Sequence, residues 1–267
     1  MTKLAVFSAI PLVASVFAAC ASQPAPQAET ASTAAATPTP AAAPEPASGK
    51  VDATPIAAPV ANVPPTCAHG TKAADNGLID DLEDGNDKSA PLDGRNGNWW
   101  VGKAEHATVS IPAGAVKPSA GGAAGGKFGM HFAGKTDNSD PWGAAVGVNF
   151  LASGAFYDAS KYAGISYKIK SAKPGLDVRL KINDVNTHPD GGKCTKECFN
   201  AFGREMIVGT EWKEMTLMWS ELTQQSDWGN PRPPMIEPHK LKDVEFQIWP
   251  GADFDIWIDD VHFLACQ

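Results

Sequence analysis

The chain has 267 residues, of which 43% are apolar and 19% are charged. This length suffices for one domain of ordinary size together with additional segments. The formal net charge is -8 at pH 7, which argues against nucleic acid or an anionic membrane surface as partners, because both demand clustered Lys and Arg.

The chain starts with MTKLAVFSAIPLVASVFAAC, in which an apolar run ends at Phe17 and small residues precede Cys20. The run is too short to span a bilayer comfortably, and it predicts a cleaved secretory signal over residues 1–19. The residues before Cys20 resemble the lipobox of bacterial lipoproteins, and this resemblance implies a lipid on Cys20. Phe17 stands where that box prefers Leu, so plain secretion stays open as the alternative.

Residues 20–66 are rich in Ala and Pro, contain no aromatic residue and carry few charges. Such a composition buries almost nothing and predicts an extended tether, with a reach on the order of 140 Å in a polyproline form. No Asp follows Cys20 directly, and in bacterial lipoproteins such an Asp is often the inner-membrane signal. We therefore expect an exported lipoprotein of the outer membrane, facing the periplasm or the cell surface.

The five cysteines indicate how the folded part is closed. With Cys20 assigned to lipid, Cys67 and Cys266 bracket the folded residues, and Cys194 and Cys198 lie four positions apart. We predict the disulfides Cys67–Cys266 and Cys194–Cys198, because the termini of a domain are often close and an exported protein is oxidised. Zinc is the alternative, but one close pair matches a zinc site poorly.

Short β-rich segments fill the remainder of the chain and are separated by Gly, Pro, Asn and Asp. A single stretch, SELTQQ, indicates a helical turn. Many strands without crossover helices predict an all-β antiparallel β-sandwich, a jelly roll, over residues 67–267. The predicted strands are 127–134, 144–150, 162–170, 177–184, 204–209, 214–219, 243–249 and 254–263.

Two of these strands alternate strictly between apolar and polar residues, which is typical of a sheet with one face in the core. The residues expected to face the core are Val178, Leu180, Ile182, Val244, Phe246 and Ile248. Those expected on the other face are Arg179, Lys181, Asn183, Glu245, Gln247 and Trp249.

Acidic clusters stand at both ends of the domain, in LIDDLEDGNDK (78–88) and in IWIDDVHF. If the first and last strands are neighbours, these clusters meet. Gathered carboxylates repel one another unless a cation lies between them. Calcium suits such a place, because it takes six to eight oxygen ligands without demanding one geometry.

The stretches DDLEDG, YDASKYAGISYKIKS, EWKEMTLMWSEL, DWG and FDIWIDDVHF resemble the galactose-binding-type jelly rolls of carbohydrate-binding modules, most of all family 11, over about residues 75–265. This resemblance implies a structural calcium held by Glu83 and Asp260, with Asp81 and Asp259 as helpers. The alternative, solvated acids at strand ends, is preferred for Asp80, Asp84 and Asp87.

The resemblance also implies binding of a β-glucan or similar polysaccharide on an exposed sheet face, where flat aromatic rings and hydrogen-bonding side chains are needed. Each candidate has a packing alternative: the Trp residues fold over the rim or edge, and Arg179 pairs with Glu245. Trp99, Trp100, Trp212, Trp219 and Trp257 are expected to be packing residues. The ligand-binding candidates are Trp249, Gln247, Arg179, Asn183, Trp142 and Trp228.

Signatures of hydrolases are missing from the sequence. It contains no Glu-x-Asp and no Gly-x-Ser-x-Gly, and its six histidines are scattered without metal-ligand spacing. Glu245 and Asp255, expected on adjacent strands, are the remaining carboxylate pair for glycoside hydrolysis, but solvated charges explain them better. The sequence therefore predicts a non-catalytic protein.

Three functions follow in order of preference. The first is a lipid-anchored monomer that binds polysaccharide and touches the membrane only through its lipid. The second is a structural or adhesive envelope lipoprotein that binds a protein or peptidoglycan. The third is a glucan hydrolase with an unrecognised site.

Overall fold

The computed structural model describes residues 64–111 and 116–267. The predicted signal peptide, Cys20 and nearly all of the predicted tether lie outside the described residues. Within the described ranges, no helix is long and apolar enough to cross a membrane.

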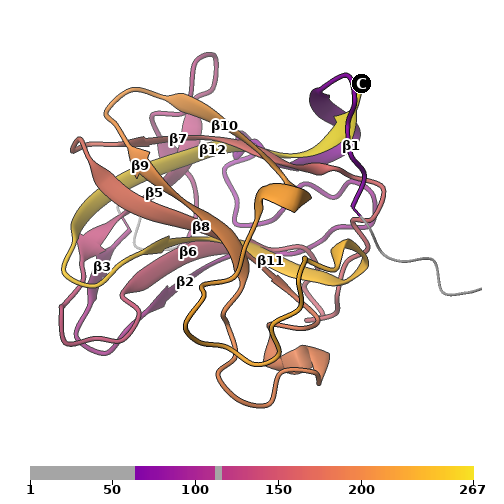
Figure 1. The fold of residues 1–267 in the computed structure, drawn as a ribbon. Coiled ribbons are helices and arrows are strands. Elements are labelled where there is room, and N and C mark those ends of the chain that lie inside the picture. The colour runs from indigo at the N-terminus through magenta and orange to yellow at the C-terminus, as the bar shows by residue number, and fades with distance from the viewer. Residues whose placement is uncertain (1–63, 112–115) are drawn as a thin grey trace, which may run out of the picture. The chain divides into compact units, whose positions relative to one another are not determined.

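The described residues form two antiparallel sheets that stack as two layers (Figure 1). This arrangement confirms the predicted all-β sandwich. One sheet has five strands in the order β2 (Trp99–Lys103), β6 (Ala144–Asn149), β11 (Leu241–Ile248), β8 (Leu176–Asp184) and β9 (Phe202–Val208).

The other sheet has seven strands, five of which follow the order β10 (Lys213–Met218), β7 (Gly164–Ser171), β12 (Asp253–Cys266), β5 (Phe128–Lys135) and β3 (Thr108–Ser110). The two remaining strands are β1 (Thr71–Asp80), which pairs with β12, and β4 (Ser119–Ala120), which pairs with β5. Three short 3-10 helices lie in the connections: η1 (Pro189–Gly191), η2 (Trp219–Glu221) and η3 (Pro238–Lys240).

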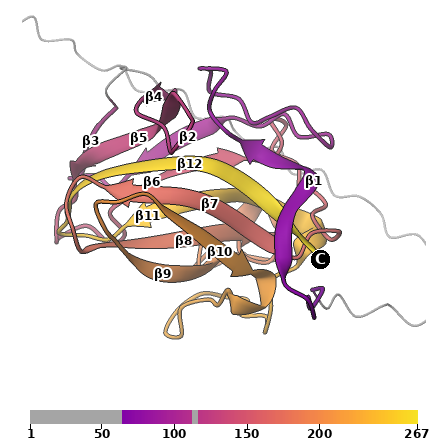
Figure 2. The same ribbon diagram turned by 90° about the horizontal axis from the view of Figure 1, so that it is seen from above.

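All eight predicted strands are present, and β1 to β4 were not predicted. The strand β1 reads TKAADNGLID, which is poor in the β-branched and aromatic residues that favour strands. It forms because the long final strand β12 provides a partner along its length, from Thr71 opposite Cys266 to Asp80 opposite Val261. Figure 2 shows β1 beside the C-terminal part of β12. The acidic clusters at the two ends of the domain therefore do approach each other, as expected.

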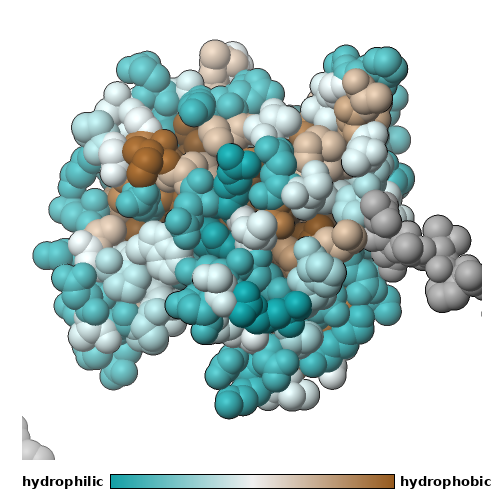
Figure 3. All heavy atoms as spheres, in the orientation of Figure 1, coloured by the Kyte–Doolittle hydropathy of each residue, from teal (hydrophilic) through white to brown (hydrophobic). Residues whose placement is uncertain are grey.

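The core fills the space between the sheets. The apolar sides of β8 and β11, including Val178 and Phe246, are fully buried, as the alternation predicts. On the other sheet, Phe263 stacks on Tyr157 and Tyr162 with ring centroids 5.8 and 4.6 Å apart. All three tyrosines of the chain, Tyr157, Tyr162 and Tyr167, are buried. On the face shown in Figure 3, hydrophilic residues predominate and hydrophobic ones form a few separate patches.

Both predicted disulfides are present, Cys67–Cys266 with Cα atoms 4.9 Å apart and Cys194–Cys198 with Cα atoms 5.6 Å apart. Because all four sulfurs are paired, the zinc alternative does not apply to them. The first disulfide joins the two ends of the domain beside β1 and β12. The second closes a small ring in the connection between β8 and β9.

Candidate functional site

Polar side chains of β8 and β11 form a row on the outer face of the five-stranded sheet. Strand alternation places them there, since their neighbours along each strand enter the core. The pairing register sets Lys181 opposite Glu245 and Arg179 opposite Gln247. All four are at least nine-tenths buried, which is unusual for an outer sheet face. Something other than the strands must cover them.

The adjoining strands carry glycines in the same row, so no side chain projects from the sheet at these positions. Gly147 on β6 lies opposite Glu245, and Gly203 on β9 lies opposite Lys181. A Cβ atom on Gly147 would lie 2.7 Å from the ring of Trp100 on β2. The indole of Trp100 therefore rests directly on the backbone of its neighbouring strand, in a place that only glycine leaves open.

Aromatic residues rise on both sides of this row and enclose a groove of about 710 Å³. On the β2 side stand Trp100 and Trp142, and Trp249 follows the end of β11. On the opposite side the connection after β8 contributes Phe199, and the connection after η2 contributes Trp228. We call this space the groove, and its floor consists of Lys181, Glu245 and Gln247.

The charges of the floor are paired within the protein. Lys181 Nζ lies 2.6 Å from Glu245 Oε1, with the side chains 11% and 9% exposed. Gln247 Nε2 donates a hydrogen bond to the Trp142 carbonyl at 2.7 Å, which ties the floor to one wall. An ammonium has three N–H groups and a carboxylate about four acceptor positions, so one ion pair leaves hydrogen-bonding capacity unused on both partners.

A smaller polar hollow of about 320 Å³ adjoins the groove and shares Trp100, Phe199 and Glu245 with it. Asn183 Nδ2 donates to Asp243 Oδ1 at 2.9 Å, while the buried Asn183 Oδ1 has no hydrogen-bond partner. Burial and the negative charge of Glu245 raise the pKa of Asp243 above its ordinary value. The hollow thus offers an acceptor that a ligand hydroxyl would satisfy.

Four of the six predicted ligand residues, Trp142, Trp228, Gln247 and Trp249, line the groove together. Asn183 lines the adjoining hollow. Arg179 does not line the groove: its guanidinium donates to the Thr223 carbonyl at 2.7 Å and pairs with Glu205 at 3.5 Å. The alternative expected for it, a pair with Glu245, does not form because Lys181 occupies that carboxylate.

Trp100 was expected to be a packing residue and instead lines the groove. Trp99 and Trp219 are buried, as expected, with 1% and 0% of their surface exposed. Sequence reasoning also missed Phe199 and Gln225, which reach the groove from loops without periodicity. The alternation of β8 did place Lys181 on the outer face, although it gave that residue no role in a site.

The supposed carboxylate pair Glu245 and Asp255 is not a pair. These residues were expected on adjacent strands, but β11 and β12 belong to different sheets. Asp255 instead contacts His131, with 2.6 Å between Oδ1 and Nε2. Glu245 and Asp255 therefore share no cleft, which removes the geometry that glycoside hydrolysis requires of two carboxylates.

The acids nominated for calcium are only partly brought together. Glu83 Oε1 accepts the backbone N–H groups of Lys127 and Phe128, and Asp259 Oδ2 accepts that of Ala123. Both carboxylates approach Gly126, where an added Cβ would lie 2.9 Å from Glu83 Oε1 and 3.5 Å from Asp259 Oδ2. Burial, with smaller contributions from Asp260 and Glu83, raises the pKa of Asp259 to about 6.

The other two nominated ligands have protein partners. Asp260 Oδ2 forms an ion pair with Lys168 Nζ at 2.6 Å, and Asp81 Oδ1 accepts the backbone N–H of Glu83 at 3.3 Å. In the part of the chain that the structure describes, no three His, Cys, Asp or Glu side chains gather as metal ligands. Calcium at the nominated acids stays a prediction, and of the four only Glu83 and Asp259 both approach Gly126.

Comparisons with known proteins found similar solved structures but no similar sequence family. No family model matches the sequence, and no curated protein matches it. The structure is similar to the family 11 carbohydrate-binding module from Clostridium thermocellum in complex with a β-1,3-1,4-mixed-linked tetrasaccharide, with 17% identity over 74% of this chain and 98% of that chain and a TM-score of 0.49.

It is also similar to the family 30 module of a cellulosomal cellulase of Clostridium thermocellum, with 13% identity over 63% of this chain and 91% of that chain and a TM-score of 0.45. Both of these structures are carbohydrate-binding modules, the kind of protein that the sequence resembles. At these identities the function of the chain rests on its own groove.

Proposed function

We propose that this protein binds a single chain of a β-glucan-type polysaccharide in the groove and does not cleave it. The observation that carries the proposal is the pairing of aromatic walls with a polar floor. Trp100 and Trp142 stand on one side, Phe199 and Trp228 on the other.

The chemistry of a pyranose ring matches such a groove. Its faces carry C–H groups that pack on aromatic rings, and its hydroxyls lie around the ring edge, where they both donate and accept. Lys181, Glu245 and Gln247 supply donors and acceptors at the floor. Walls on two sides admit one extended chain and not the flat surface of a crystalline polymer.

The state of the floor supports binding without hydrolysis. The carboxylate that lines the groove, Glu245, is held in an ion pair with Lys181. A glycosidase needs one carboxylic acid to donate a proton and a second carboxylate facing it. Asp255 lies in the opposite sheet and does not face Glu245.

The test is electrophoresis of the full chain in native gels containing soluble mixed-linkage β-1,3-1,4-glucan, β-1,3-glucan or xylan. We expect the β-glucans to retard it, and Trp249→Ala to weaken binding by about tenfold or more, as for a central aromatic anchor. Trp257→Ala is the matched control, because that indole lies on the other sheet. Equal retardation of both variants would contradict the groove, and no retardation would favour a protein or peptidoglycan partner.

Two further parts of the proposal rest on sequence alone. The lipobox-like residues before Cys20 support a lipid anchor, and the Ala- and Pro-rich residues 20–66 support a tether that holds the domain at the cell envelope. Metabolic labelling with a palmitate analogue, compared with Cys20→Ser, tests the anchor. Loss of label in the variant is expected, and label that persists would contradict it.

Calcium bound beside Glu83 and Asp259 is the remaining proposal. Their proximity at Gly126 supports it, since a cation there would relieve the repulsion between the two carboxylates. A chelator is then expected to lower the melting temperature of the wild type but not of Asp259→Asn. An equal chelator effect on both proteins would contradict this site.

A further inference from the structure

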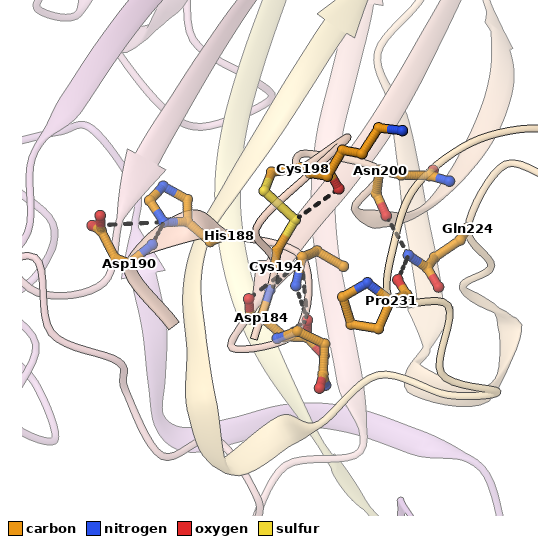
Figure 4. The surroundings of a disulfide bond; sticks show 11 residues. Asp184, His188, Asp190, Cys194, Cys198, Asn200, Gln224 and Pro231 are labelled. Carbon is orange, nitrogen blue, oxygen red and sulfur yellow. Dashed lines mark hydrogen bonds and ion pairs between the residues drawn. A yellow bond between two sulfur atoms is a disulfide. The ribbon is translucent and has the colours of Figure 1, made fainter. Parts of the chain in front are cut away.

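The wall that carries Trp228 consists of two loops, and neither belongs to a sheet. One is the connection from β8 to β9, which contains the Cys194–Cys198 ring and Phe199. The other follows η2 and contains Gln224, Gln225 and Trp228. Figure 4 shows these loops meeting beside the disulfide, where Asn200 and Gln224 are joined by a hydrogen bond.

Asn200 connects the two loops with nearly all of its hydrogen-bonding capacity. Its side chain is 2% exposed, and its Nδ2 donates to the carbonyls of Gln225, at 3.0 Å, and of Trp228. Its Oδ1 accepts the Gln225 N–H at 2.9 Å. The Asn200 carbonyl accepts from Gln224 Nε2 at 2.7 Å. Four hydrogen bonds therefore run from one residue to one short segment.

These bonds determine where the indole of Trp228 lies. Trp228 Nε1 donates to Gln225 Oε1 at 2.8 Å, and the backbone of Gln225 is held from both sides by the amide of Asn200. The backbone of Gly229 also packs on this amide, since a Cβ there would lie 2.6 Å from Asn200 Cβ. Asn200 thus fixes Trp228 at its carbonyl and, through Gln225, at its ring.

The loop that carries Asn200 is itself constrained. The Cys194–Cys198 disulfide closes a ring two residues before it, and the Phe199 N–H donates to the Thr187 carbonyl at 2.8 Å. The ring of Phe199 packs edge-on against His188 at 5.3 Å. Lys196 in the ring forms a β-bridge with Asn230 in the second loop. The segment directly before Asn200 is therefore fixed by the disulfide ring and by the contacts of Phe199.

We propose that Asn200 is a positioning residue of the glycan site, which acts through Gln225 to hold Trp228 in the groove wall. It does not line the groove itself. This inference rests on the proposed function for its effect on affinity, but the placement of Trp228 is measurable without any ligand.

The ligand-free experiment follows the indole N–H resonances of the full-length chain by ¹⁵N NMR, with the Trp228 peak assigned by Trp228→Phe. Asn200→Ala is expected to shift and broaden that peak and to speed its exchange with water, while the buried Trp219 indole, bonded to the Tyr162 carbonyl, stays unchanged. Asn186→Ala is the control, because this buried asparagine bonds to Asp184 and Glu237 instead. An unmoved Trp228 peak in Asn200→Ala overturns the proposal.

The second experiment is a double-mutant cycle on affinity for soluble mixed-linkage β-1,3-1,4-glucan. Asn200→Ala is expected to weaken binding about tenfold, and to have no further effect once Trp228→Ala is present, because coupled residues are not additive. Additive losses in a folded protein would overturn the action through Trp228. If the wild type binds no glucan, the proposed function fails, and the NMR result still decides the positioning role.

Discussion

The outer faces of the two sheets each carry a tryptophan, but the two indole rings pack in different ways. On the five-stranded sheet, Trp100 lies opposite Gly147, and its ring rests on the backbone of that glycine. On the seven-stranded sheet, Trp257 lies opposite His131, and the two rings stack with centroids 4.1 Å apart and planes 8° apart. The residue across the strand pair thus decides whether a tryptophan lines an open groove or is packed by the protein itself.

The ion pairs of the two faces differ in the same way. Lys181 and Glu245 are 11% and 9% exposed under the groove walls, whereas Lys168 and Asp260 are 29% and 34% exposed on the other sheet. The long connections that follow β8 and η2 rise around the first face and place Phe199 and Trp228 above it. On this outer face the loops shield the polar residues from water but leave the space above them open, and a groove results.

The largest expected effect is on the free energy of unfolding, and it differs between the two disulfides. Cys67→Ser/Cys266→Ser opens a loop with a sequence separation of 199 residues, and the variant is expected to lose about 5 kcal/mol of unfolding free energy by chain entropy. Cys194→Ser/Cys198→Ser opens a separation of only 4 residues and should cost about 2 kcal/mol.

Urea unfolding measures both losses. The second variant should also bind glucan more weakly, since its ring supports the groove wall, whereas the first should keep its affinity while folded. Unchanged affinity in Cys194→Ser/Cys198→Ser, with weaker binding in Cys67→Ser/Cys266→Ser, would show that the Cys194–Cys198 ring has no part in the groove.

The next effect compares the two ion pairs. Lys181→Ala leaves the Glu245 carboxylate buried without its partner, and we expect a loss of about 3 kcal/mol. Lys168→Ala, on the more exposed pair with Asp260, should cost less than about 1 kcal/mol. Both values come from the midpoint of urea unfolding at neutral pH. Equal costs would mean that the groove floor is as well hydrated as the other face.

A pH-dependent effect concerns Asp80, which was expected to be a solvated acid but is buried. It accepts hydrogen bonds from the Trp99 indole and the Leu82 N–H and so links β1 to β2. Burial raises the pKa of Asp80 from 3.8 to about 7. Between these values the folded protein holds a proton that the unfolded chain has lost, so the free energy of unfolding falls as the pH rises. We expect a decline of roughly 3 kcal/mol from pH 4 to pH 7 from this residue.

Urea unfolding across this pH range, for the wild type and Asp80→Asn, checks the prediction. The variant should show a shallower decline, because asparagine does not titrate. Parallel profiles for the two proteins would assign the pH dependence to other buried acids such as Asp243 and Asp259, whose pKa values are also raised.

Much of the site was readable from local pattern. Alternation in β8 and β11 placed Lys181, Glu245 and Gln247 on the outer face, because successive residues of a strand point to opposite sides. Trp142 and Trp228 were found because they stand in polar, turn-rich segments. Phe199 and Gln225 were missed because loops carry no such period.

By itself the sequence determined the class of fold, both disulfides and the sides of β8 and β11 that face the core. The fold class and the strand faces follow from patterns that span a few residues. The disulfides follow from the small number of cysteines, which leaves few ways to pair them. Only the tertiary structure decided that β11 and β12 lie in different sheets, that Trp100 lies on Gly147, and that Lys168 takes Asp260. Such contacts join residues far apart in the chain, and no local pattern specifies which distant partner a side chain meets.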